Sequence, residues 1–161
     1  MAQQARRIPF HLRRKVSGAL QQLENDDIIE KVEGPTTWIS PLVVISKSDG
    51  TVQLCVDTQI ANCAIKREQR PRPTVDDLIN KLNEAEVFSK LDLRSGYHQL
   101  SLAHESRYII TFATHEGLRR YKRLNFATNS ASELFQQVIH DQIHNIPGAM
   151  NISDDVIVYG K

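Results

Sequence analysis

The sequence predicts an α+β domain, because segments with helical periodicity alternate with β-prone hairpins along a chain of 161 residues. Apolar residues recur at helical spacing over roughly residues 11–24. Two further segments have the pattern of β-hairpins, one turning at Asp49-Gly50 and the other at Asp154-Asp155. The length suits one domain of ordinary size with a real hydrophobic core.

Composition and charge favour a soluble domain over a membrane-spanning or strongly basic one. The chain has 40% hydrophobic and 24% charged residues, which is typical of soluble domains, and no apolar run approaches the ~20 residues that span a bilayer. The net charge is only +1, so a surface that binds nucleic acid would have to be a local patch of positive charge. Cys55 and Cys63 lack metal-ligand spacing and follow no signal segment. We therefore expect reduced thiols in an intracellular protein, with cytoplasm and nucleus both open.

The first expected element is an amphipathic helix over roughly residues 11–24, followed by a break at Gly34-Pro35. A dense group of basic residues surrounds the start of this helix: Arg6, Arg7, Arg13, Arg14 and Lys15. This group is either a solvated helix start or a surface that contacts the phosphates of a template strand.

The next elements are predicted to be mainly strands. Residues 38–46 form one strand, Lys47 to Gly50 the turn, and residues 52–56 the alternating return strand. A helix is expected over residues 75–82, with Thr74 as its N-cap and Asp76-Asp77 as acids of its first turn. A strand starting at residue 87 should end near Asp92, before Ser95-Gly96 breaks the pattern.

A second β pair is expected over residues 108–113 and 118–124. It carries another basic group, in which Arg120 and Lys122 share one face of the strand. That face contacts template backbone or is simply a solvated edge. Ser130 and Glu133 have the spacing of a capping box at the start of the following helix.

The acid pair Asp154-Asp155 is distinctive because β-prone runs flank it on both sides. Two carboxylates about 4 Å apart repel by roughly 4 kcal/mol at an effective dielectric near 20, and a bound cation removes that cost. The alternative is an exposed turn with solvated carboxylates. Asp92, at the end of an earlier strand, is the natural third acid. Three such carboxylates are typical of two-metal phosphoryl-transfer sites.

Residues 88–100, around Asp92, resemble the first catalytic motif of reverse transcriptases from gypsy/Ty3-type long-terminal-repeat retrotransposons. Ile152-Ser153-Asp154-Asp155 resembles the acid-pair motif of the same enzymes. Several connecting segments also match this family in the same order, namely residues 7–13, 40–44, 48–50, 54–57, 111–115, 121–124 and 130–136.

The resemblance implies the fingers and part of the palm of a right-hand polymerase, with an antiparallel palm sheet and packed helices. The fingers would comprise residues near 1–66 and 103–135, and the palm residues near 67–102 and 136–161. The implied activity is RNA-directed DNA polymerase, which extends a primer on an RNA or DNA template using deoxynucleotide triphosphates. Asp92 and Asp154 would hold two Mg²⁺ ions, or Mn²⁺, and Asp155 would assist.

The resemblance also implies residues that bind the nucleotide. Lys47 matches the lysine that binds the triphosphate, and Gln53 stands where the family normally has an arginine. Tyr97 matches the aromatic steric gate that excludes ribonucleotides, although without the motif it would read as an ordinary core tyrosine. Gln136 matches the glutamine beside the nucleotide sugar. Ala127 occupies a position where the family almost always has glycine.

The chain ends one strand after the acid pair, and the family's thumb, connection and ribonuclease H regions are not in it. We therefore expect a polyprotein fragment or truncated copy with little or no polymerase activity alone. The alternatives are a non-catalytic remnant that binds nucleic acid through its basic groups, and an inert pseudogene product that folds poorly.

Overall fold

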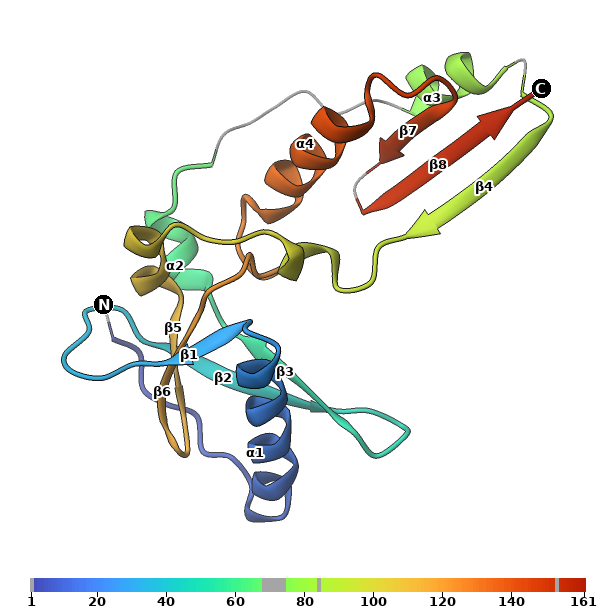
Figure 1. The fold of residues 1–161 in the computed structure, drawn as a ribbon. Coiled ribbons are helices and arrows are strands. Elements are labelled where there is room, and N and C mark those ends of the chain that lie inside the picture. Colours follow the sequence, from blue (N-terminus) through green and yellow to red (C-terminus); the bar gives the residue numbers. More distant parts are fainter. Residues whose placement is uncertain (1, 68–74, 84, 153) are drawn as a thin grey trace.

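Two β-sheets organise the chain in the computed structural model, which describes residues 2–67, 75–83, 85–152 and 154–161 (Figure 1). One sheet has five strands in the order β1-β6-β5-β2-β3, and the other has three in the order β4-β8-β7. Helices accompany both sheets, so the predicted mixed α+β class is confirmed. Thr74 and Ser153, two residues of the expected motifs, lie outside the described residues.

The five-stranded sheet contains the first predicted hairpin. The turn at Asp49-Gly50 joins two antiparallel strands, and Gly50 has a φ of +78°, a conformation that glycine adopts without strain. β2 and β5 pair in parallel, with Ser40 opposite Phe112. The strands of this sheet are β1 (Ile29–Lys31), β2 (Ser40–Ser46), β3 (Val52–Val56), β5 (Thr111–Thr114) and β6 (Gly117–Tyr121).

The predicted amphipathic helix is α1 (Phe10–Asn25), and it packs its apolar stripe on this sheet. Val16 and Leu20 are completely buried there, together with Phe112 and Tyr121. A short helix, α2 (Gln59–Ala64), follows β3. Within the part of the chain that is described, no helix combines the length and apolar character needed to cross a bilayer.

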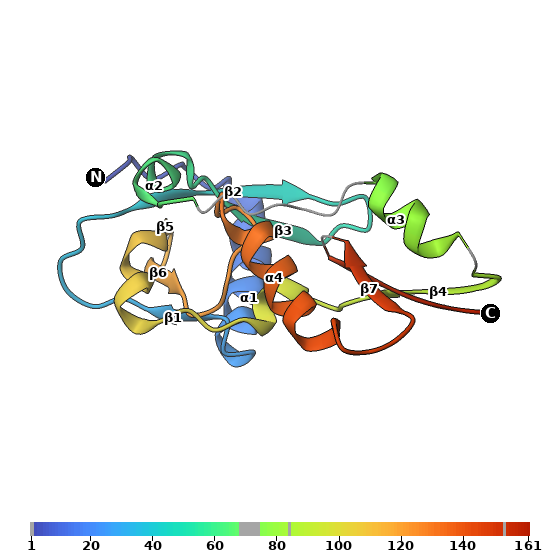
Figure 2. The ribbon, with the colours of Figure 1, turned by 90° about the horizontal axis from the view of Figure 1, so that it is seen from above.

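The three-stranded sheet is formed by β4 (Val87–Asp92), β7 (Ala149–Ile152) and β8 (Asp155–Gly160), all antiparallel. The helix α4 (Ala131–Ile143) lies beside β7 (Figures 1 and 2), and Asn151 on β7 donates a 2.9 Å hydrogen bond to the backbone oxygen of Gln136 on α4. The helix α3 (Val75–Leu82) has the bounds that the sequence predicts. The hairpin predicted around the acid pair is also confirmed.

Two local predictions were wrong. The strand expected from residue 108 begins only at Thr111, because residues His104–Ile110 form the 3₁₀ helix η2, and the Thr111 hydroxyl closes its last turn on the Tyr108 carbonyl at 2.8 Å. The capping box at α4 does not form, since Ser130 makes no side-chain cap. Glu133 instead binds Arg67 at 2.5 Å, because a buried carboxylate gains more from a cationic partner.

Candidate active site

Asp92 and Asp155 lie directly opposite each other in the ladder between β4 and β8. Residues in that position project from the same face of a sheet, with Cβ atoms ~4.5–5.5 Å apart. Asp154 precedes β8 at the hairpin, where Ile152 pairs with Asp155. Folding therefore brings the three predicted acids to one end of the three-stranded sheet.

Each carboxylate of the acid pair already has a partner. The Tyr97 hydroxyl donates a 2.8 Å hydrogen bond to Oδ1 of Asp154. The Nζ of Lys90 lies 2.7 Å from Oδ2 of Asp155. The hydrogen bond to Asp155 raises the pKa of Lys90 above its ordinary value, and the negative charges of Asp155 and Asp92 add to that rise. The phenol of Tyr97 thus contacts one carboxylate of the pair and the ammonium group of Lys90 the other.

The acids suit a hard divalent cation in chemical type, because Mg²⁺ prefers carboxylate oxygens. Their backbone positions also suit it, since Asp92 and Asp155 share a ladder pair. However, no three His, Cys, Asp or Glu side chains among the described residues are close enough to form a preformed metal site. In this arrangement Asp154 is bound by Tyr97 and Asp155 by Lys90.

The segment after β4 places Tyr97 at the acid pair. Ser95 has a left-handed φ of 51°, and the 3₁₀ helix η1 (Gly96–Gln99) follows it. A Cβ added at Gly96 would lie 2.7 Å from Cζ of Phe135, so only glycine lets η1 approach α4 this closely. The Tyr97 ring then packs on Phe135 at 4.9 Å between centroids. The Ser95-Gly96 break seen in the sequence therefore has a steric cause.

The other predicted nucleotide-binding residues lie in different parts of the fold. Gln136 is buried on α4, where its backbone oxygen binds Asn151 of β7. Lys47 and Gln53 are exposed on the β2–β3 hairpin, Lys47 at the turn and Gln53 opposite Ile45. Figure 1 shows the tip of this hairpin away from the start of β8. The structure thus does not bring Lys47 or Gln53 into contact with the three acids.

The loop containing Ala127 forms without glycine. The carbonyl of Ala127 accepts hydrogen bonds from the Thr58 hydroxyl at 2.6 Å and from Asn62 at 2.9 Å, and its amide donates to Asn125 at 2.6 Å. Ala127 is not among the described residues with positive φ. The β-carbon at this position is therefore compatible with the loop, which is held against α2.

The second basic group is largely neutralised by acids. Arg120 pairs with Glu30 on the neighbouring strand β1 at 2.5 Å, and Lys122 pairs with Asp27. The hydrogen bond from Lys122 is the main cause of a lowered pKa at Asp27. The same group includes Arg119 and Arg123, which pair with Glu24 and Asp27 respectively. These contacts reduce the positive field that this surface presents.

The first basic group, around the start of α1, makes fewer ion pairs with acids than the second. Arg6 pairs with Asp57 at 2.7 Å, but no ion pair to Arg7, Arg13 or Arg14 is found within the described segments. These three side chains belong to exposed residues at the start of α1. Arg13 also lies over the ring of Phe10, 5.7 Å from its centroid. This end of α1 is therefore the more available cationic surface.

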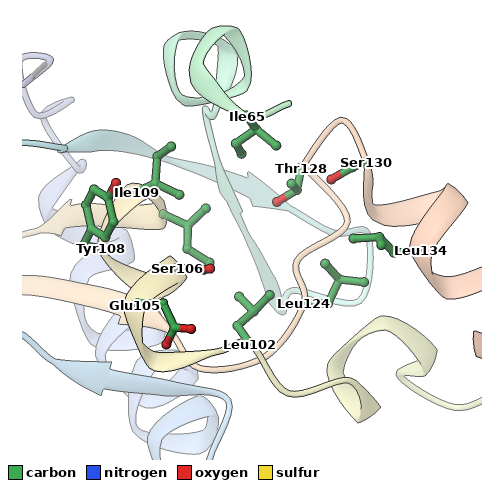
Figure 3. Close-up of a pocket in the computed structure, with 11 residues that line it drawn as sticks. Ile65, Leu102, Glu105, Ser106, Tyr108, Ile109, Leu124, Thr128, Ser130 and Leu134 are labelled. Atoms are coloured by element: carbon green, nitrogen blue, oxygen red, sulfur yellow. The ribbon is translucent and has the colours of Figure 1, made fainter. Parts of the chain in front are cut away.

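A cavity of about 300 Å³ lies between η2, the end of α2 and the start of α4 (Figure 3). Its lining is mainly apolar, including Ile65, Leu102, Leu124 and Leu134, and it contains none of the three candidate acids.

Lys90 is the site residue that sequence reasoning missed. Its position two residues before Asp92 on a strand was the available signal, because residues i and i+2 share a face.

No protein-family model matches the sequence. The chain is 31% identical over 162 residues to the retrovirus-related Pol polyprotein of transposon 412 from Drosophila melanogaster, an alignment that covers 96% of this chain and 13% of the polyprotein. It is 29% identical to the corresponding polyprotein of the Drosophila melanogaster transposon gypsy, over 91% of this chain and 15% of that protein. The chain therefore spans about an eighth of the length of these relatives.

Solved structures share the fold. The native protease–reverse transcriptase of prototype foamy virus superposes with a TM-score of 0.82 and 17% identity, over 99% of this chain and 21% of the viral chain. The foamy viral protease–reverse transcriptase in complex with double-stranded DNA gives a TM-score of 0.80 and 18% identity, over 98% of this chain and 33% of that chain.

Proposed function

We propose that this chain, which is homologous to a region of the retrovirus-related Pol polyproteins of gypsy/Ty3-type transposons, forms the nucleotidyl-transfer site of a reverse transcriptase. The observation that carries the proposal is the ladder pair of Asp92 and Asp155, with Asp154 beside it at the hairpin. The five-stranded sheet would belong to the fingers and the three-stranded sheet to the palm.

In this proposal Asp92 and Asp154 hold two Mg²⁺ ions, and Asp155 assists by keeping the local charge negative. Bound there, such ions would supply activation of the primer 3′-hydroxyl and stabilisation of the charge on the leaving oxygens. The protein itself mainly positions the reactants and stabilises charge. Tyr97 and Lys90 would hold the carboxylates of Asp154 and Asp155 in place before an ion binds.

The nucleotide would be held by residues from both sheets. Tyr97 is suited to distinguish deoxyribose from ribose, because its ring packs on Phe135 and its hydroxyl is hydrogen-bonded to Asp154. Lys47 is an exposed cation on a hairpin turn, which suits contact with a triphosphate. Gln53 donates hydrogen bonds but brings no charge, so its contribution is weaker than that of an arginine.

A non-catalytic role in binding nucleic acid is the second candidate, and the exposed arginines Arg7, Arg13 and Arg14 favour it. Foamy viral protease–reverse transcriptase, which shares the fold, was solved with double-stranded DNA and with an RNA/DNA hybrid. Both candidates predict binding that weakens with salt. They differ in whether the acids bind metal, which makes metal binding the decisive experiment.

Calorimetric titration of the chain with Mn²⁺ and Mg²⁺ tests the proposed function. Asp92→Asn and Asp154→Asn should each weaken binding by about tenfold or more, because each removes a charged ligand oxygen. Asp26→Asn, in an acid pair at the end of α1, is the matched control and should leave binding unchanged. Metal binding that survives Asp92→Asn at full strength, or no binding by the parent chain, contradicts the proposal.

Primer extension provides the second readout. We expect little extension by this segment alone with Mg²⁺ or Mn²⁺, since it spans a small part of its relatives. Any extension should disappear in Asp154→Asn. Extension that persists in that variant would place the chemistry elsewhere.

A further inference from the structure

Lys90 stands on the same face of the three-stranded sheet as the candidate acids. It lies two residues before Asp92 on β4, and it pairs in the ladder with Ile157, two residues after Asp155 on β8. Lys90 is thus diagonal to Asp155, a separation that a long side chain spans. Its Nζ reaches Oδ2 of Asp155 at 2.7 Å.

The ladder pair of Asp92 and Asp155 carries an electrostatic cost. Like charges directly opposite each other on antiparallel strands destabilise the pairing. Lys90 brings a positive charge to this pair from the strand of Asp92. Its ammonium group therefore offsets the repulsion between two acids that belong to different strands.

The ion pair is also easy to break. The side chains of Lys90 and Asp155 are 67% and 36% exposed, so water competes for both partners. Exposed ion pairs of this kind make a small contribution to stability. A divalent cation that binds the same acids would therefore displace the ammonium group without a large loss elsewhere.

We propose that Lys90 is a built-in counter-ion, which holds Asp92 and Asp155 together before metal arrives and competes with a divalent cation for them. This inference rests on the proposed function, because it assumes that the acids bind metal. Lys90 is a positioning residue here, since it acts through the carboxylate of Asp155. Its charge lowers the affinity of the site for metal and stabilises the fold when metal is absent.

The variant Lys90→Met tests this role, because it removes the charge and keeps an unbranched apolar side chain. In EDTA, its melting temperature should fall slightly below that of the parent chain, by the small contribution of one exposed ion pair. Its Mn²⁺ dissociation constant, measured by calorimetry at neutral pH, should fall by about threefold to tenfold, because a nearby positive charge repels the ion. Lys31→Met is the matched control, since Lys31 lies on β1 of the five-stranded sheet and pairs with Glu24 of α1. It should leave Mn²⁺ affinity unchanged.

A second arm tests the partner. In an Asp155→Asn background, Lys90→Met should not lower the melting temperature further, because the ion pair is already gone. An unchanged or weaker Mn²⁺ affinity in Lys90→Met, or an unchanged melting temperature in EDTA, would overturn the counter-ion role alone. If neither the parent chain nor Lys90→Met binds Mn²⁺, the proposed function itself fails.

Discussion

The hydroxyl of Tyr97 donates a hydrogen bond to Oδ1 of Asp154, a residue 57 positions later in the chain. The bond connects η1, which follows β4, to the hairpin between β7 and β8. The Tyr97 ring is packed against Phe135 of α4 at the same time. One side chain therefore links the acid pair to the helix that supports the three-stranded sheet.

Tyr97→Phe removes this hydrogen bond and keeps the ring. We expect the free energy of unfolding to fall by about 0.5–1.5 kcal/mol, the usual worth of one hydrogen bond. Tyr97→Ala also loses the packing on Phe135 and should cost about 3 kcal/mol. Urea denaturation measures both values. Equal losses for the two variants would show that the ring packing contributes nothing.

Gly96→Ala should destabilise the fold, because the added Cβ would meet the Phe135 ring at 2.7 Å. Overpacking of this kind costs about 1–3 kcal/mol. Gly18→Ala is the matched control in α1, where a Cβ meets nothing within 4 Å. That substitution should stabilise by up to about 1 kcal/mol, since alanine favours helix. Thermal melting compares the two, and a stable Gly96→Ala would contradict the close approach of η1 to α4.

Local sequence signals were sufficient for most elements of this fold. The Asp49-Gly50 turn, the apolar spacing of α1 and the entry acids of α3 each act within a few residues of one another. Partnerships between distant residues were not accessible in this way. Glu133 had a plausible local partner in Ser130, but it binds Arg67, which lies 66 positions away. Tertiary contact therefore overrode the capping signal.

The same limit applies to the candidate site. The three acids were predicted because motifs of a known family surround them, and the ladder between β4 and β8 brings Asp92 opposite Asp155. The ion pair between Arg120 and Glu30 depends on β1 pairing with β6, and no local sequence pattern predicts that pairing. The spacing of Lys90 and Asp92 was visible, but only the structure shows the contact with Asp155.

The stability of the fold should depend on pH through His98. Burial of this side chain lowers its pKa below the usual value of 6.5. The folded chain then binds this proton less readily than the unfolded chain. Protonation of His98 therefore favours the unfolded chain. The free energy of unfolding has its full value above about pH 6.5 and decreases as pH falls through the lower pKa of the folded chain. His98→Phe, which preserves a ring next to Tyr121, should show a smaller fall in melting temperature between neutral and acidic pH. Parallel curves for the two proteins would rule out this contribution.

Nucleic-acid binding should rely more on the basic residues around the start of α1 than on Arg120 and Lys122. Replacing Arg7, Arg13 and Arg14 with glutamine should weaken binding of a labelled template–primer and reduce the slope of log K against log salt by up to about 3. The double variant Arg120→Gln/Lys122→Gln should have a smaller effect, because Glu30 and Asp27 already neutralise these cations. Fluorescence anisotropy across a salt series measures both. Equal losses per charge removed would argue against this ranking.

In the proposed function, Asp92, Asp154 and Asp155 form one divalent-cation site. Paramagnetic broadening by substoichiometric Mn²⁺ in amide NMR spectra tests this directly. We predict that the amides of these three acids and of Tyr97 broaden first, and that Asp92→Asn strongly reduces the effect at the same Mn²⁺ concentration. Broadening centred on another part of the chain, or none at these residues, would contradict the account.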